Sequence, residues 1–371
     1  MSNVILVGAF GQGNPGDEAL CAAFCGSLVD HDVTVVSADP MATIRDHGRD
    51  AILATSRNVA VAARQADAVV VGGGTVFKQL AASAGRASNA LLLNTAALVA
   101  GAHASGTSVA MIGVGAGRLR GGAARSLCRW IVPHTDLVVL RDEESAAVLA
   151  NTGTRPPFWI GADPAWRLFD VLHDADRNLD SRRTITIALS HHAVERADIG
   201  VLITALRPLV DDWDIRLQPW QSGTNTLDHQ LALILQQRLG RAEIIPPPTD
   251  IQDAARIFAK DALVIGMRFH ALVAAAAGGA RFVAISHEPK LAGLARRLDQ
   301  ASVPGHATAE VLRATISWAL VNEPASPEAL RRERAGADLE FQMLELLLNG
   351  GTVKEPNRVP AMALSSGKGK W

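Results

Sequence analysis

Cysteine is scarce in this sequence and tyrosine is absent. The 371 residues include three cysteines, Cys21, Cys25 and Cys128, and no two of them have the C-x-x-C spacing. An odd and sparse set of this kind argues against a disulfide framework and against a zinc knuckle. We therefore expect a reducing, cytoplasmic setting. Abundant alanine and an excess of arginine over lysine accompany the missing tyrosine, and we assign no function to this bias.

The chain also lacks a sizeable net charge. Its 36 basic and 37 acidic residues leave a formal charge of −1. Long-range attraction to nucleic acid or to an anionic membrane needs an excess of positive charge. The composition therefore gives no reason to expect nucleic acid as a partner, and any anion site must be local.

No apolar run predicts a membrane span or an export signal. Ala87–Gly117 carries no formally charged residue and is longer than the roughly 20 residues that a membrane helix needs. Polar residues interrupt it at Asn94, at His103 and over Ser105–Ser108. A buried helix, a turn and a buried strand are predicted there. The apolar run Val4–Val7 is too short for a secretory signal, so no export is expected.

The chain does contain a repeated alternation of β-branched runs with Ala- and Leu-rich segments of helical length. This alternation is typical of parallel sheets covered by helices on both faces. The length favours two domains over one, so two Rossmann-like domains are predicted. The predicted strands are Val4–Val7, Val33–Ser37, Ala68–Val71, Val109–Ile112 and Leu137–Leu140, then Ile185–Leu189, Ile215–Pro219, Glu243–Ile245, Ala262–Ile265 and Phe282–Ile285, with a helix over Val194–Val210.

Changes in composition mark the predicted domain boundaries. Prolines and a polar run between Gly153 and Arg183 indicate a linker. Ser326-Pro327-Glu328 has the residue types of a helix start. We predict an N-terminal domain over 1–155, a linker over 156–183, a C-terminal domain over 184–325, a helix over 326–349 and a disordered tail over 350–371.

The first glycine-rich segment, Gly11–Gly16, has the G-x-G-x-x-G spacing of dinucleotide-binding loops, with Asp39 where a ribose-binding acid belongs. However, Asp17 and Glu18 follow directly, at a helix start where they would repel a pyrophosphate. A tight strand-to-helix turn, with these two acids satisfying the first amides, is favoured over an acceptor-binding loop. Dinucleotide binding is the least favoured. Either acid could also act as a base toward a sugar hydroxyl.

Two further glycine-rich loops follow predicted strands. They are Gly72–Gly74 and Gly113–Gly122, and the second carries Arg118 and Arg120. Glycine permits positive φ and lets a ligand approach the backbone closely. Each loop could be an ordinary turn, but three such loops at one sheet edge predict a wide polar floor for a cleft.

A polar constellation follows two strands of the predicted second domain. Arg268 and His270 lie between the strand Ala262–Ile265 and a run of small residues that would form a helix. A guanidinium beside helix N-terminal amides binds phosphate or carboxylate well, and a bound anion would favour protonated histidine. The alternative is an arginine at a domain interface and a core histidine. Lys290, after the next strand, faces the same cleft by topology.

Other polar residues are weaker candidates. Arg141 ends a strand of the first domain and either reaches across the cleft or pairs with the acids Asp142–Glu144. His191 and His192 lack a third metal ligand, so an exposed loop pair is predicted and no metal site. Asp163 is interpreted as a turn residue.

Five segments, in this order, resemble the bacterial polysaccharide pyruvyltransferases. They are Gly13–Ala19 (GNPGDEA), Gly72–Gly74 (GGG), Leu140–Ser145 (LRDEES), Ala162–Pro164 (ADP) and Gly266–His270 (GMRFH), and the resemblance runs from about Val4 to Ala295. It implies transfer of the pyruvyl group of phosphoenolpyruvate to a sugar as a ketal. It also implies two domains facing a cleft, similar to the GT-B glycosyltransferase fold. No cofactor is expected.

The resemblance implies roles for individual residues. Arg141, Arg268 and His270 match family residues that hold phosphoenolpyruvate, and His270 and Arg268 are the expected catalytic residues. Ser286–Lys290 (SHEPK) is similar to the family's S-Y-D-P-K, with His287 and Glu288 as departures that leave the acceptor specificity open. The expected substrate-binding residues are Arg141, Arg268, Phe269, His270, Lys290, Asn14, Asp17, Glu18, Gly73 and Gly74.

Two rival functions remain open at this point. One is a GT-B glycosyltransferase that uses a nucleotide sugar, and the other is a non-catalytic relative that binds an anionic metabolite. The sequence does not predict the acceptor sugar, its hydroxyl pair or the oligomeric state. The acceptor could be free, polymeric or lipid-linked, and a lipid-linked one would bring the protein to the inner membrane surface.

Overall fold

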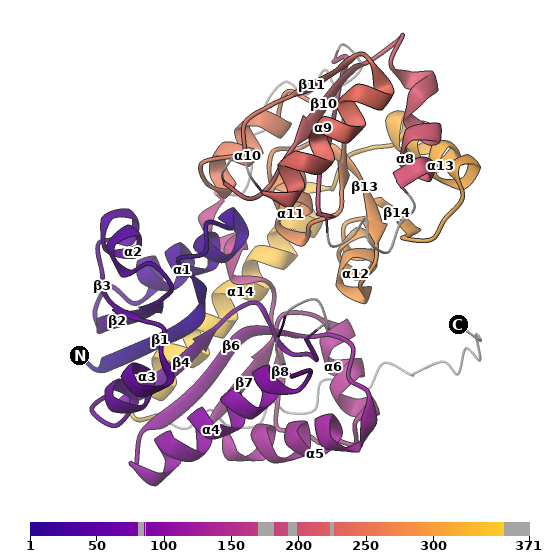
Figure 1. The fold of residues 1–371 in the computed structure, drawn as a ribbon. Coiled ribbons are helices and arrows are strands. Elements are labelled where there is room, and N and C mark those ends of the chain that lie inside the picture. The colour runs from indigo at the N-terminus through magenta and orange to yellow at the C-terminus, as the bar shows by residue number, and fades with distance from the viewer. Residues whose placement is uncertain (81–84, 86, 170–181, 192–198, 223–225, 352–371) are drawn as a thin grey trace.

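The computed structural model describes residues 1–80, 85, 87–169, 182–191, 199–222 and 226–351. These residues form two α/β lobes, each built on a parallel sheet (Figure 1). The predicted pair of Rossmann-like units is confirmed. Residues 352–371 of the predicted tail and 170–181 of the predicted linker lie outside the described residues.

The first lobe contains an eight-stranded sheet with the order β3-β2-β1-β4-β6-β7-β8, and β5 pairs with β6 off this path. β4 consists of alanine, valine and a final glycine, and it is buried along its whole length. A strand of this composition suits the middle of a parallel sheet, where both faces are covered. The strands are β1 (Asn3–Phe10), β2 (Asp32–Ser37), β3 (Asp50–Leu53), β4 (Ala68–Gly72), β5 (Thr75–Phe77), β6 (Ser108–Ala116), β7 (Leu137–Leu140) and β8 (Trp159–Ile160).

Helices cover both faces of this sheet. Val4 and Leu6 of β1 belong to the same core as Phe24 of α1, whereas Ile5 belongs to the core that contains Leu92 of α4. Successive residues of one strand therefore face opposite layers. The helices of the lobe are α1 (Pro15–Ser27), α2 (Pro40–His47), α3 (Ser56–Ala63), α4 (Ala90–Ala104), α5 (Gly121–Ile131), η2 (Val132–His134), α6 (Glu143–Asn151) and η3 (Pro164–Leu168).

The second lobe contains a six-stranded parallel sheet with the order β11-β10-β9-β12-β13-β14. Its strands are β9 (Thr184–Ala188), β10 (Asp214–Gln218), β11 (Ala242–Ile244), β12 (Leu263–Gly266), β13 (Arg281–Ser286) and β14 (Ala301–Pro304). Its helices are α8 (Ile199–Leu206), η5 (Arg207–Leu209), α9 (Leu227–Leu239), α10 (Ile251–Phe258), α11 (Phe269–Ala277), α12 (Pro289–Arg297) and α13 (Ala309–Val321).

The last helix, α14 (Pro327–Leu348), joins the lobes. Its predicted start is confirmed, because the Ser326 hydroxyl accepts a hydrogen bond from the Ala329 amide at 3.1 Å. α14 packs against η3, β6 and β7 of the first lobe, and Figure 1 shows it crossing from one lobe to the other. One hydrophobic core also continues from Leu6 in the first lobe to Phe282 in the second.

The segment Ala87–Gly117 contains α4, a turn and β6, as predicted. Within the described ranges, no helix is long and apolar enough to cross a membrane. Strands β3, β5, β8 and β14 were not predicted. They have two to four residues, each includes partly or fully exposed positions, and each pairs with a neighbouring strand. β8 and η3 fall in the range predicted as a linker. The described part of the predicted helix Val194–Val210 forms α8 and η5.

Candidate active site

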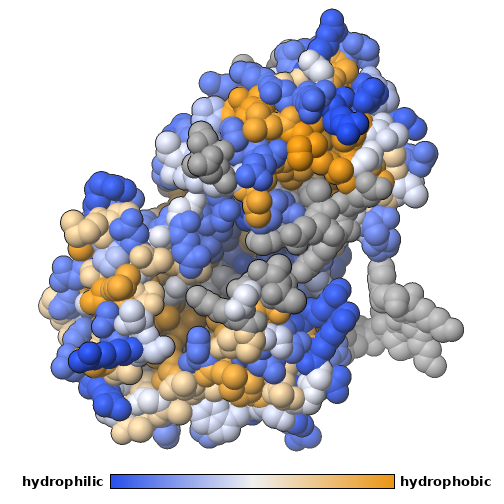
Figure 2. All heavy atoms as spheres, viewed as in Figure 1, coloured by the Kyte–Doolittle hydropathy of each residue, from blue (hydrophilic) through white to orange (hydrophobic). Residues whose placement is uncertain are grey.

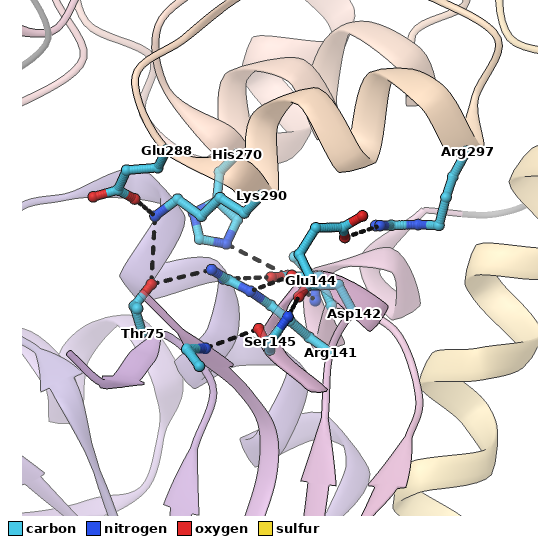
Figure 3. Close-up of polar contacts among 12 residues, drawn as sticks. Thr75, Arg141, Asp142, Glu144, Ser145, His270, Glu288, Lys290 and Arg297 are labelled. Carbon is cyan, nitrogen blue, oxygen red and sulfur yellow. Dashed lines mark hydrogen bonds and ion pairs between the residues drawn. The ribbon is translucent and has the colours of Figure 1, made fainter. Parts of the chain in front are cut away.

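Segments that follow strands of the two sheets meet between the lobes. They are Gly11–Asp17 after β1, Gly73–Thr75 after β4, Arg141 after β7, Arg268–His270 after β12 and Glu288–Lys290 after β13. The carboxyl ends of parallel strands are where α/β folds bind ligands. The surface is hollowed between the lobes at this level (Figure 2), and polar contacts link the two sides (Figure 3).

His270 lies in the first turn of α11 and faces the first lobe. Its Nε2 is 3.4 Å from Oδ1 of Asp163. Asp163 caps η3 by accepting a hydrogen bond from the Ala165 amide at 3.1 Å. Burial alone would raise the pKa of Asp163, but His270 and Arg141 lower that pKa to about 2. An ionised carboxylate therefore stands beside His270 as the partner for an imidazolium.

Arg141 is buried, and its guanidinium contacts residues of both lobes. Nη1 donates to Oδ2 of Asp163 at 3.2 Å, and Nε lies 3.3 Å from Oδ2 of Asp142. Nη2 donates to Oγ1 of Thr75 at 3.1 Å, and the guanidinium carbon is 4.6 Å from the centre of the Phe269 ring. The two predicted alternatives for Arg141 thus coexist, because it pairs with an adjacent acid and also reaches the second lobe.

Lys290 enters the site from the first turn of α12. Its Nζ is 2.6 Å from Oε2 of Glu288 and 3.4 Å from Oγ1 of Thr75 (Figure 3). Burial lowers the pKa of Lys290, and Glu288 opposes this effect. Burial would raise the pKa of Glu288, but Lys290 lowers that pKa to about 2. Glu288, which departs from the family segment, is therefore the negative partner of Lys290.

Arg268 stands immediately before α11 and is held from the second lobe. Its Nη2 is 2.5 Å from Oδ2 of Asp228, and its Nε donates to the Leu189 carbonyl at 3.3 Å. Asp228 is fully buried in α9 and pairs with Nδ1 of His191 at 2.8 Å. Burial would raise the pKa of Asp228, but Arg268 and His191 lower it.

The prediction of an exposed histidine pair is wrong for His191. Its side chain is only 14% exposed. The Asp228 carboxylate accepts a hydrogen bond from the His191 backbone N–H at 2.9 Å and also pairs with the His191 ring. Asp228 lies 37 residues further along the chain, which is why the sequence alone gave no sign of the pairing. His192 lies outside the described residues.

The G-x-G-x-x-G segment forms the strand-to-helix turn that was favoured. Asp17 and Glu18 were predicted to satisfy the first amides of the helix, but Asn14 takes that place and Glu18 bonds to an earlier amide of the loop. The Asn14 side chain accepts from the Gly16 amide at 3.1 Å, and Glu18 accepts from the Gly11 amide at 2.8 Å. Two amides that a pyrophosphate would use are therefore occupied by the loop's own side chains.

Asn14 and Asp17 are the residues of this turn whose side chains lie next to the second lobe. Oδ1 of Asn14 also accepts from the Trp220 indole of the second lobe at 3.1 Å, and its Nδ2 donates to Asp17 at 2.6 Å. Burial raises the pKa of Asp17, while the nearby His270 lowers it in part. Glu18 turns away toward His47, which lies 3.3 Å from its second oxygen. The turn thus brings Asp17, and not Glu18, to His270.

Gly73 and Gly74 contribute through the backbone. Their φ angles are 64° and 74°, in the region that residues with a Cβ adopt only with strain. The Gly73 amide donates to the Ile112 carbonyl at 2.8 Å, and the Gly74 carbonyl accepts from Gly115 at 2.7 Å. These bonds turn the chain so that Thr75 enters the site.

The site therefore contains three cations, each paired with a carboxylate: Arg141 with Asp163, Arg268 with Asp228 and Lys290 with Glu288. Such an arrangement can bind a small polyanion and move a proton through His270. In the part of the chain that the structure describes, no group of three or more His, Cys, Asp or Glu could hold a metal ion.

A family model described as polysaccharide pyruvyl transferase matches residues 14–289 of the chain. None of the curated proteins compared with the chain matches it.

Several solved structures are similar over nearly the whole chain. The Staphylococcus aureus MnaA–UDP structure has a TM-score of 0.62 at 13% identity and covers 96% of this chain and 99% of its own. Anabaena Alr3699/HepE with UDP-glucose has a TM-score of 0.62 at 14% identity, with 94% and 100% covered. Neisseria meningitidis UDP-GlcNAc 2-epimerase has a TM-score of 0.58 at 12% identity, with 94% and 100% covered. These likenesses show a GT-B-like fold.

Proposed function

Because the chain belongs to the polysaccharide pyruvyl transferase family, we propose that it transfers the pyruvyl group of phosphoenolpyruvate to two hydroxyls of one sugar. The sugar belongs to a polysaccharide or to its precursor. The product is a pyruvate ketal, and inorganic phosphate is released. The second lobe holds most of the donor site, and the first lobe carries the acceptor.

The reaction sets three requirements for the protein. C3 of phosphoenolpyruvate takes up a proton and becomes a methyl group, while one sugar hydroxyl attacks C2. The C2–O bond to phosphate then breaks, and the second hydroxyl attacks the same carbon. The two hydroxyls release two protons, of which one balances the proton gained by C3 and the other leaves with phosphate. The site must therefore supply an acid, a base and a clamp for a polyanion.

The observation that carries the proposal is the position of His270. It stands at the amino end of α11, pairs with the ionised Asp163, and lies two residues after Arg268. A protonated imidazole in this position is a proton donor surrounded by anion-binding groups. We assign it the proton transfer to C3, a role that typically contributes about 10²–10⁴-fold to the rate.

The three cations supply the clamp. Arg268 and Lys290 come from the second lobe and Arg141 from the first, so the donor carboxylate and phosphate would draw the lobes together. A charge-assisted hydrogen bond contributes on the order of 1.5–3 kcal/mol. The Phe269 ring packs against the Arg141 guanidinium.

Asp17 is the residue that we assign as the base toward the acceptor hydroxyl. Its carboxylate lies near His270, and burial raises its pKa. A raised pKa makes a carboxylate a stronger base. The Glu18 carboxylate already accepts a hydrogen bond from the Gly11 amide and lies beside His47, so Glu18 is not assigned this role.

Phosphate release from phosphoenolpyruvate tests the proposal. The protein is incubated with phosphoenolpyruvate and a panel of free, polymeric and lipid-linked sugars, and binding of phosphoenolpyruvate is measured separately by calorimetry. We expect saturable binding and acceptor-dependent release of phosphate. UDP- and GDP-sugars serve as parallel donors. Consumption of a nucleotide sugar without binding of phosphoenolpyruvate would overturn the proposal in favour of glycosyl transfer.

A further inference from the structure

The Thr75 hydroxyl occupies a distinctive position between the lobes. It accepts a hydrogen bond from Nη2 of Arg141 in the first lobe at 3.1 Å and one from Nζ of Lys290 in the second lobe at 3.4 Å (Figure 3). Two cations from different lobes thus converge on one neutral oxygen. Thr75 was not predicted as a site residue, because only the glycines that precede it form a motif.

The backbone holds Thr75 in this place. Thr75 pairs with Gly115 in the register of β5 and β6. A Cβ on Gly115 would lie 2.8 Å from Nε and from Nη2 of Arg141, so the missing side chain makes the space in which the guanidinium reaches Thr75. The contact between Thr75 and Arg141 is therefore built into the sheet.

The donor and acceptor capacity of the hydroxyl then matters. A threonine hydroxyl has two acceptor lone pairs and one hydrogen to donate. Arg141 and Lys290 use both lone pairs, and among the contacts of the described residues the hydroxyl donates no hydrogen bond. The hydrogen must point away from both cations. Cationic donors also polarise the O–H bond and strengthen it as a donor.

We propose that Thr75 is a substrate-binding residue whose hydroxyl donates a hydrogen bond to the anionic donor held between Arg141 and Lys290. This inference rests on the proposed function, in which that anion is phosphoenolpyruvate. A purely structural role would require only that Thr75 fill space in β5. A direct role requires the hydroxyl itself, so the two roles are distinguished by isosteric substitution.

Calorimetric titration with phosphoenolpyruvate tests the proposal on four proteins. Thr75→Val keeps the shape and β-branching and removes the hydroxyl, and we expect affinity to fall by roughly 10- to 100-fold, the loss of one hydrogen bond to a charged group. Thr75→Ser restores the hydroxyl and should bind within about threefold of the wild type. Thr315→Val is the matched control, because its hydroxyl bonds to a carbonyl of its own helix at 2.8 Å.

Melting temperatures and a second variant make the result interpretable. We expect Thr75→Val to melt within a degree or two of the wild type, since one partly exposed hydroxyl is lost. Thr75→Ala, also without a hydroxyl, should show the same loss of affinity if Thr75→Val is poorly folded. Wild-type affinity in a folded hydroxyl-free variant would overturn this inference and leave the proposed function intact. Absence of binding by the wild type would instead count against the proposed function.

Discussion

His270 lies between two carboxylates whose pKa values are shifted in opposite directions. The pKa of Asp163 is lowered to about 2, whereas burial raises the pKa of Asp17. Pairs of titratable groups that are pushed apart in this way divide acid and base work between them. Asp163 stays ionised at every pH at which the protein would be assayed, so it positions His270. Asp17 is the carboxylate that can take up a proton.

Replacement of His270 by glutamine separates a chemical role from a structural one. Glutamine preserves size and hydrogen bonding but has no titratable proton. We expect turnover to fall by about 10²–10⁴-fold while the affinity for phosphoenolpyruvate changes little. Initial rates of phosphate release give the turnover, and calorimetric titration with phosphoenolpyruvate gives the affinity.

The control for His270→Gln is His103→Gln, at an exposed position near the end of α4. It should have wild-type turnover and wild-type affinity for phosphoenolpyruvate. A folded His270→Gln protein with near wild-type phosphate release would show that His270 is not the proton donor.

The proposed role of Asp17 as a base predicts an acidic limb in the pH dependence of phosphate release, measured from pH 5 to 9. A base must be ionised to act, so activity falls as the pH decreases through the raised pKa of Asp17. In Asp17→Asn we expect turnover reduced by about 10²–10⁴-fold and the acidic limb removed. Glu18→Gln, its neighbour in the same turn, should retain turnover within about threefold. Equal losses in both variants would mean that the turn, and not the Asp17 carboxylate, is required.

At the scale of elements, α1 and α11 approach each other closely at the site. A Cβ on Gly16 would lie 2.1 Å from Nδ1 of His270, so Gly16→Ala must displace the imidazole or the helix. A displacement of about 1 Å in a catalytic group can reduce the rate about 100-fold, and we expect a loss of that size in phosphate release.

Gly101→Ala is the matched control for Gly16→Ala. Gly101 lies within α4, and nothing is found within 4 Å of the added Cβ. This substitution should leave the rate unchanged and raise the free energy of unfolding by about 0.5–1 kcal/mol, because alanine is the better helix former. Unchanged phosphate release in Gly16→Ala would show that the close contact is unimportant.

Much of the fold could be predicted because its central strands carry their own signal. β4 is a run of alanine and valine between turns, and it is recognisable without its neighbours. β5 and β8 have three and two residues and exist because β6 and β7 offer hydrogen-bonding edges to them. Short strands of this kind depend on tertiary pairing, which a local pattern does not contain.

The candidate site also contains residues that the sequence predicts and residues that only the fold brings together. Arg268 and His270 were predicted because they follow a buried strand directly. The partners of these residues could not be predicted. Asp228 is fully buried in α9, where only the fold brings it to Arg268. Asp163 was identified as a turn residue, but its second role as the partner of His270 depends on contact between the lobes.

At the scale of the whole molecule, α14 places a buried carboxyl group beneath the site. Glu340 has no exposed surface. A Cβ on Gly161 would lie 2.9 Å from Oε2 of Glu340, and one on Gly113 would lie 3.2 Å from Oε1. Burial raises the pKa of Glu340 well above its usual value, and Asp163 raises it further. The carboxyl is therefore protonated in the folded protein at pH values where it is ionised in the unfolded chain.

This difference predicts how stability depends on pH. A carboxyl whose folded-state pKa is raised stabilises the folded chain fully below its unfolded-state pKa, and the contribution is lost as the pH rises toward the folded-state pKa. Relative to Glu340→Gln, the wild type should lose unfolding free energy as the pH rises above about 5, by at most about 1.4 kcal/mol per pH unit until the folded-state pKa is reached. Urea unfolding at pH 5, 6, 7 and 8 measures this difference.

The exposed Glu328 of the same helix provides the control. The difference between the wild type and Glu328→Gln should stay constant over the same range. If the difference between the wild type and Glu340→Gln were also constant, Glu340 would be ionised in the folded protein and the assignment would be wrong.

The path of α14 also determines how the molecule can be divided. The first lobe is a module made of two stretches of chain, one ending with η3 and the other formed by α14, with the whole second lobe between them. A fragment that stopped after η3 would leave the sheet face under α14 uncovered, and exposed apolar faces of that kind promote aggregation. A chimera that exchanges first lobes between two relatives therefore needs two junctions, so that each first lobe keeps its own final helix.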